Sequence, residues 1–259
     1  MNIDLHQYLT NEFFAYAIVF CRIGSALMAL PGLGDSFVSA RIRLLLALAM
    51  CLLITPNIRQ NLPAIPDSVS MLTMIAGTEL LYGAFLGLIG RIIIGTMHTA
   101  GMIIATNSSL ASAMLFDPNQ STQGTVVGNM LGMTAITLVF ASDLYQQVIL
   151  AFANSYDVFQ VGNLDKFPDI AHFIVRLSAD SFNLAAKISS PVIVVILLAY
   201  VTSGLLSRLM PAIQIFFIMV PVQIMVSLML LIITLSGIYI TFSNHFSAGY
   251  SGQIESGGF

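Results

Sequence analysis

The chain has 259 residues, of which 57% are apolar and only 8% are charged, and its formal net charge is −3. A soluble domain of ordinary composition carries charge on roughly a quarter of its residues. A mean hydropathy of +0.91 therefore means that apolar faces are covered by lipid or by other protein chains, which excludes a free cytosolic enzyme. With nine basic residues the chain has no basic stripe for a phosphate backbone, so nucleic acid is excluded as a partner.

The first predicted elements are two apolar helices near the N-terminus. Residues 13–30 form the first, which ends at Pro31. Residues 44–55 form the second, which ends at Pro56. Its uncharged stretch of 12 residues is short of the roughly 20 that cross a bilayer, so a span, a partial crossing and a helix buried in protein all stay open.

The remaining predicted elements follow from further apolar runs between Pro, Gly, Asp and Asn breaks. In chain order we expect a helix over 69–113, a polar break at 117–121, a helix over 122–141, a shorter helix ending near 154, a loop over 156–168, helices over 169–209 and 211–242, and a flexible Gly/Ser tail at 246–259. The sequence thus predicts one all-α membrane domain over residues 1–259, built of hydrophobic helical hairpins with about six to eight helical segments.

No catalytic or ligand-binding pattern is present, and we expect no enzyme, cofactor or metal site. Cys21 and Cys51 lie inside apolar runs without a second ligand at metal-binding spacing. The four histidines lie in different segments: His6, His98, His172 and His245.

Small residues predict close helix packing at two places. Gly124, Gly128 and Gly132 are spaced four apart and line one helix face, and Gly83 and Gly87 repeat the spacing earlier in the chain. Glycines in such register let a second backbone approach closely. Whether the contact of the first three lies within the chain or between chains stays open.

Three charged residues are embedded in apolar runs: Arg22, Glu79 and Arg91. Each costs roughly 3 kcal/mol in hydrocarbon, so each needs a partner or water. Glu79 and Arg91 are too far apart on one helix to pair, whereas Arg22 and Glu79 are expected to pair across a helix contact. A proton relay or substrate site is the alternative.

Polar residues recur at helical spacing in one later segment: His172, Arg176, Asp180, Asn183 and Lys187. They lie opposite an apolar face, so one side of this helix is exposed to water or is paired with other polar groups. A solvated face and a face that docks a partner or lines an aqueous path both remain open.

A last segment combines small polar residues with apolar bulk before a proline: its candidate functional residues are Leu110, Met114, Leu115, Phe116, Asp117 and Pro118. A loop there needs protein or a cavity around it, because lipid leaves its backbone groups unpaired. A hydrophobic plug and a packed helix end are equally compatible with these residues.

The order of several motifs resembles the FliR/SctT family, the export-gate subunit of flagellar and virulence type III secretion. The resemblance covers nearly the whole chain and rests on these pieces: Phe20-Cys21-Arg22-Ile23 before Pro31-Gly32, Phe37-Val38-Ser39-Ala40-Arg41-Ile42-Arg43 before Pro56, Glu79 with Gly83 and Gly87, Asp117-Pro118, and Pro211 through Gln214 and Phe216 to Pro221.

The resemblance implies that one copy joins five FliP-like and four FliQ-like subunits in a heteromeric, cone-like helical assembly, with an FlhB-like subunit near its entrance. That assembly passes unfolded export substrates, lies in the bacterial inner membrane within the flagellar basal body or secretion apparatus, and contacts membrane lipid. Residues 110–118 match the family's pore plug. The resemblance favours flagellar biosynthesis over the virulence injectisome.

Two alternatives remain at this stage. The same family also serves virulence injectisomes. A small-solute channel or secondary transporter is a different class, with Glu79, Arg91 and Asp143 as its polar sites in the membrane.

Overall fold

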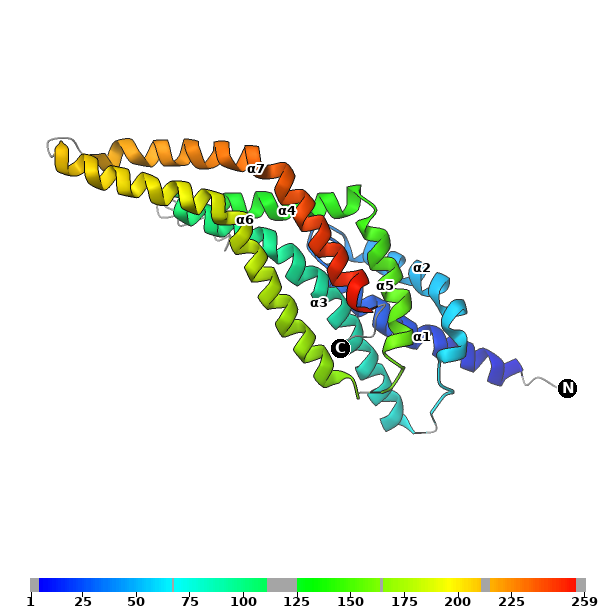
Figure 1. Ribbon diagram of the computed structural model, residues 1–259. Coiled ribbons are helices and arrows are strands. Elements are labelled where there is room, and N and C mark those ends of the chain that lie inside the picture. The colour runs from blue at the N-terminus through cyan, green and yellow to red at the C-terminus, as the bar shows by residue number, and fades with distance from the viewer. Residues whose placement is uncertain (1–4, 67, 111–124, 164, 211–214, 255–259) are drawn as a thin grey trace. The chain divides into compact units, whose positions relative to one another are not determined.

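The computed structural model describes residues 5–66, 68–110, 125–163, 165–210 and 215–254. These residues form seven α-helices and one short 3₁₀ helix, and no β-strand occurs among them (Figure 1). The predicted all-α fold is confirmed. In chain order the elements are α1 Leu5–Ala29, α2 Ala40–Ile58, η1 Arg59–Asn61, α3 Val69–Asn107, α4 Val126–Ala141, α5 Leu144–Val158, α6 Phe167–Leu209 and α7 Ile215–Ile254.

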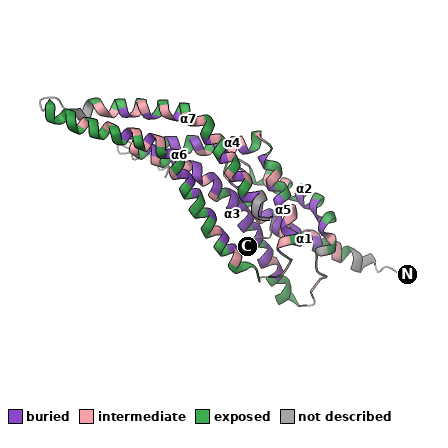
Figure 2. Ribbon diagram, viewed as in Figure 1, coloured by how far each residue is buried: buried purple, intermediate pink, exposed green. Residues whose placement is uncertain are grey.

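Within the described residues, five helical stretches are long and apolar enough to cross a membrane: Leu9–Ala29, Ala40–Ile58, Val69–Asn107, Phe167–Leu209 and Ile218–Tyr250. Helices α4 and α5, taken together across their break, pass the same criterion as a sixth. In the most apolar stretch of α3, 61% of the residues are buried, compared with 33% in that of α6 and 17% in that of α7. Figure 2 shows the exposed residues that run along α6 and α7. These apolar faces need lipid or other protein chains to cover them.

The chain forms two compact units. Unit 1 consists of Met1–Ile92, Ser142–Leu177 and Phe246–Phe259, and unit 2 consists of Ile93–Ala141 and Ser178–His245. Helices α3, α6 and α7 each contribute to both units. Three of the four points where the chain passes from one unit to the other thus lie inside helices, and a single domain over residues 1–259 remains a prediction.

Helix α1 and the first half of α3 approach closely in unit 1. A Cβ atom on Gly83 would overlap the carbonyl oxygen of Arg22 and the hydroxyl of Ser25, and one on Gly87 would overlap the carbonyl oxygen of Ala26. Glycine at these two positions therefore lets one helix backbone lie directly against the other.

Helix α2 does not end at Thr55 as predicted, because it passes through Pro56 and ends at Ile58. Proline lacks an N–H group, so Pro56 cannot donate to the carbonyl oxygen of Leu52, and the helix ends two residues later. With 19 residues, α2 is long enough to span a membrane. The loop after α5 is also shorter than predicted, since α5 continues to Val158 and α6 begins at Phe167.

The predicted flexible tail at 246–259 is wrong for residues 246–254. Helix α7 continues to Ile254, and Phe246 and Tyr250 are buried with ring centroids 5.1 Å apart. The hydroxyl of Tyr250 donates to the carbonyl oxygen of Leu86 at 3.1 Å. Two aromatic side chains four residues apart therefore anchor this end of α7 in unit 1, despite the Gly and Ser around them.

We predict that Gly83→Ala lowers the midpoint of thermal unfolding of the purified protein. The added methyl group meets backbone atoms of α1, and overpacking of this kind costs about 1–3 kcal/mol. Gly77→Ala on the same helix is the matched control, because its Cβ meets nothing within 4 Å and alanine favours a helix by up to about 1 kcal/mol. Equal midpoints for the two variants would contradict close packing of α1 against α3.

Candidate functional site

The guanidinium of Arg22 is buried in unit 1 together with the carboxylate of Glu79. The two side chains are 1% and 0% exposed. Arg22 Nε donates to Glu79 Oε2 at 2.7 Å, and Arg22 Nη2 donates to Glu79 Oε1 at 2.8 Å. Two parallel hydrogen bonds of this kind are the strongest way to pair an arginine with a carboxylate. The ion pair joins α1 to α3, as expected from the sequence.

The other N–H groups of Arg22 reach the end of α5. Nη1 donates to the carbonyl oxygen of Ser155 at 3.1 Å and to its hydroxyl at 3.3 Å, and Nη2 donates to the carbonyl oxygen of Phe159 at 2.9 Å. All five N–H groups of the guanidinium therefore have acceptors. One side chain of α1 thus holds α3 and the end of α5.

Aromatic rings enclose the same guanidinium. Its central carbon lies 4.0 Å from the ring centroid of Tyr156 and 5.2 Å from that of Tyr82, distances at which the ring face attracts a cation. Tyr82 also stacks on Phe159 with centroids 4.9 Å apart, and its hydroxyl donates to the carbonyl oxygen of Asn163. We call Arg22, Glu79, Tyr82, Ser155, Tyr156 and Phe159 the buried arginine cluster.

The chemistry of this cluster favours a structural role. Both carboxylate oxygens of Glu79 accept from Arg22, and every N–H of Arg22 is used. A proton relay needs a carboxylate that exchanges protons with a neighbouring group, whereas both oxygens of this one accept hydrogen bonds from Arg22. Among the described residues, no three His, Cys, Asp or Glu side chains are placed to hold a metal ion.

Arg91, the third embedded charge, lies at the surface of unit 1. Its side chain is 51% exposed. Nε donates to the carbonyl oxygen of Ala29 at 3.1 Å, and Nη2 lies 3.4 Å from Asp35 Oδ1. The guanidinium therefore meets the end of α1 and the turn that follows it.

In unit 2 the close glycine contact is between α3 and α4 of the same chain. A Cβ atom on Gly101 would lie 2.5 Å from the Cα of Gly128, and one on Gly128 would lie 3.0 Å from the carbonyl oxygen of His98. A Cβ on Gly132 meets His98 only at 3.9 Å, an ordinary contact. Gly124 lies outside the described residues. Thr125 caps α4, because its hydroxyl accepts from the Gly128 N–H at 3.0 Å.

The chain turns sharply where α3 ends. Ser109 has a φ of +61°, a left-handed conformation that is uncommon for residues other than glycine. Its hydroxyl donates to Oε1 of the buried Gln223 at 3.2 Å. Leu110 follows and is partly buried. The other residues of the expected plug, Met114, Leu115, Phe116, Asp117 and Pro118, lie outside the described residues.

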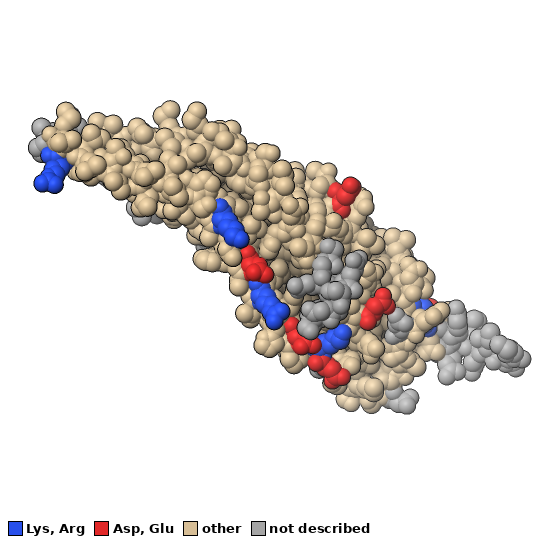
Figure 3. Space-filling model, viewed as in Figure 1, with Lys and Arg blue, Asp and Glu red and all other residues tan. Residues whose placement is uncertain are grey.

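The polar residues of α6 are all exposed: His172, Arg176, Asp180, Asn183 and Lys187. On the face drawn in Figure 3, charged side chains of alternating sign follow one another in a line along this helix. Ile170, Leu177 and Leu184 on its other side are buried. The amphipathic pattern therefore separates a buried face from a polar one.

Some functional residues have no signal in the sequence. Ser155 and Phe159 bind Arg22 mainly through backbone carbonyl groups, which every residue type carries. Gly101 was missed because its small neighbour four residues on is Ala105 rather than glycine, although alanine also permits a close helix contact.

The fold and the site define an integral membrane protein whose buried charges tie its helices together and whose apolar faces are left for other molecules to cover. Residues 13–249 match the model of the family described as bacterial export proteins, family 1. The chain belongs to this family, which includes the FliR and SctT proteins.

Individual relatives match this chain over most of their own length. The chain is 34% identical over 235 residues to flagellar biosynthetic protein FliR of Caulobacter vibrioides, covering 91% of this chain and 94% of the relative. It is 27% identical over 245 residues to FliR of Bacillus subtilis, covering 92% and 93%. It is 24% identical over 223 residues to Yop proteins translocation protein T of Yersinia pestis, covering 84% of each.

This chain is therefore a subunit of a type III protein export channel in the bacterial inner membrane. The flagellar assignment is favoured over the virulence one, because FliR of Caulobacter vibrioides is 34% identical to this chain and the Yersinia pestis protein is 24% identical. Its place is that of a structural component of the export apparatus.

Proposed function

We propose that one copy of this chain assembles with five FliP-like and four FliQ-like subunits into the cone-like gate of the flagellar export apparatus, next to an FlhB-like subunit. In this role the chain supplies part of the wall through which unfolded proteins leave the cell. The proposal rests on family membership and on one structural observation, the extent of its uncovered apolar surface.

Much of that surface lies on α2, α6 and α7. Apolar side chains that are exposed in the isolated chain include, on α2, Leu45, Leu48, Leu52 and Leu53, on α6, Val194, Leu197, Leu198 and Val201, and on α7, Met225, Met229, Ile232 and Ile233. Soluble monomers rarely expose contiguous apolar surface of this extent, which marks contact with protein or membrane. Sister subunits built from apolar helices fit such faces.

Native mass spectrometry of the chain co-expressed with its candidate sister subunits tests this assembly. We expect one particle mass that corresponds to one copy of this chain with five and four copies of the two sister subunits. A monodisperse, folded monomer in mild detergent, or a complex with several copies of this chain, would contradict the proposal.

We further propose that the segment from Leu110 to Pro118 closes the export path when no substrate is present. The family resemblance supports this role, as does the sequence, which places Met114, Leu115 and Phe116 together as apolar bulk. The turn at Ser109, tied to Gln223, fixes the direction in which the chain leaves α3. Adaptable apolar side chains are suited to sealing a pore when no substrate occupies it.

Replacing Met114, Leu115 and Phe116 by serine is expected to make the inner membrane permeable to small ions and dyes, because the apolar seal is lost. Replacing Asn119 and Gln120 by serine is the control, since it removes no apolar side chain. Dye uptake and complex abundance are measured in the same cells. An intact complex with no increase in permeability would show that this segment has no part in closure.

A further inference from the structure

The turn after α3, in unit 2, has a serine at a position that favours glycine. Ser109 has a φ of +61°, and it follows the last turn of α3, where the N–H of Ser108 donates to the carbonyl oxygen of Ile104 at 3.0 Å. A left-handed residue directly after a helix is usually glycine, because a Cβ atom makes this conformation unfavourable. Serine at position 109 therefore suggests a use for the hydroxyl group, which glycine lacks.

The hydroxyl of Ser109 has a buried acceptor on another helix. It donates to Oε1 of Gln223 at 3.2 Å, and Gln223 is only 3% exposed on α7. Both residues belong to unit 2. The hydrogen bond thus ties the backbone to α7 at the residue directly before Leu110.

Packing contributes little to holding this turn. Ser109 and Gln223 border a cavity of about 250 Å³. Gly204 lines the same cavity, and a Cβ atom there would meet nothing within 4 Å. In a close-packed interior the surrounding atoms keep a turn in place, whereas a cavity leaves it room to move. The position of Ser109 therefore depends on its hydrogen bond to Gln223.

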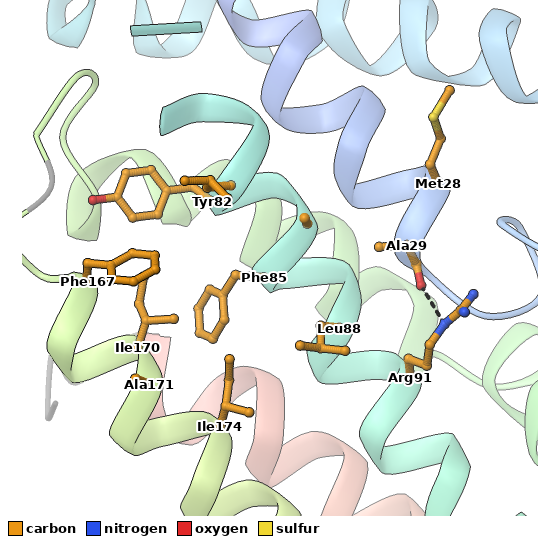
Figure 4. A pocket seen from close by; sticks show the side chains of 12 residues that line it. Met28, Ala29, Tyr82, Phe85, Leu88, Arg91, Phe167, Ile170, Ala171 and Ile174 are labelled. Carbon is orange, nitrogen blue, oxygen red and sulfur yellow. Dashed lines mark hydrogen bonds between the residues drawn. The ribbon is translucent and has the colours of Figure 1, made fainter. Parts of the chain in front are cut away.

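This cavity is polar, unlike the groove of unit 1. That groove, with a volume of about 440 Å³, is lined mainly by apolar side chains (Figure 4). The cavity in unit 2 is lined in part by the hydroxyl-bearing residues Tyr200, Ser203 and Ser207. A polar cavity of this size admits water, which competes with Gln223 for the hydroxyl of Ser109. The bond can therefore break and form again without leaving either group unsatisfied.

We propose that Ser109 and Gln223 are positioning residues for closure of the export path. Their hydrogen bond keeps Leu110, the first residue of the segment proposed to close the path, in the closed position. The inference rests on that proposed role of the segment. An ordinary hydrogen bond within a protein shifts an equilibrium by about two- to tenfold. Such a bond is weak enough for an arriving export substrate to break.

Three substitutions at Ser109 separate positioning from folding. Ser109→Gly relieves the backbone but removes the donor, so we expect dye uptake by the cells to rise about two- to tenfold while the midpoint of thermal unfolding stays the same or rises. Ser109→Ala removes the donor without relieving the backbone, so we expect the same rise in uptake with a lower midpoint. Ser109→Asn suits the left-handed conformation and carries an amide donor, so we expect uptake to stay at the level of the unsubstituted protein. Complex abundance is measured in the same cells.

Substitution of the acceptor tests the other half of the bond. Gln223→Leu is expected to raise dye uptake as much as Ser109→Gly does. The double variant is expected to raise it no further, because each change removes the same hydrogen bond. Gln146→Leu, the same change at an exposed position of α5, is the matched control and is expected to leave uptake unchanged.

Equal dye uptake by the Ser109→Gly, Ser109→Asn and unsubstituted proteins would overturn the proposal, and so would additive increases in the double variant. The serine variant of Met114, Leu115 and Phe116 distinguishes two failures. If it leaks and Ser109→Gly does not, the positioning role alone is wrong. If it does not leak, the segment has no part in closure, and the positioning role falls with it.

Discussion

The buried ion pair between Arg22 and Glu79 is the interaction on which the arrangement of unit 1 depends. In a chain with so few charges, placing two of them fully inside the protein costs several kcal/mol for each ion. That cost is offset only when the geometry is good and every remaining hydrogen-bonding group is satisfied, as it is here for all five N–H groups of Arg22. Helices α1, α3 and α5 satisfy these groups only in one relative register. The pair therefore selects that register among the many in which similar apolar helices could pack.

The close contact of α1 with α3 and the ion pair are parts of one feature. Gly83 follows Glu79 by one helical turn, and the atom that a Cβ on Gly83 would overlap is the carbonyl oxygen of Arg22 itself. A larger residue at position 83 would push α1 away and lengthen the distance that Glu79 has to reach. Further along α3, Gly87 faces α1 again, and Gly90 lies against Leu30 and the hydroxyl of Tyr250. Close backbone contact thus makes the ion pair possible, and the apolar faces left on the outside are available to lipid and sister subunits.

The sequence was sufficient to predict the helices, the family and the partner of Arg22, because apolar runs, breaks and the scarcity of charge are all local signals. It did not predict the passage of α2 through Pro56, because proline usually ends or kinks a helix. It also missed the end of α7. The Gly and Ser residues there predicted a flexible tail, although Phe246 and Tyr250 are buried and anchor the helix. The carbonyl groups that complete the site around Arg22 have no signature in the sequence, because their role depends on where the end of α5 lies in space. Tertiary contacts, not propensity, decide each of these cases.

A double-mutant cycle with Arg22→Met and Glu79→Leu tests most directly whether this pair holds the helices together. Each single change removes one partner and leaves the other charge unpaired in the interior. Such a loss typically costs about 3–5 kcal/mol. The double variant has no buried charge, so we expect its midpoint of thermal unfolding to lie above that of Glu79→Leu alone, and its loss to be smaller than the sum of the two single losses. The partly exposed pair of Arg59 and Glu12 supplies the control, where the same kind of cycle is expected to give a coupling below about 1 kcal/mol. Additive losses at Arg22 and Glu79 would show that the two side chains do not act as a pair, and would contradict this account of the fold.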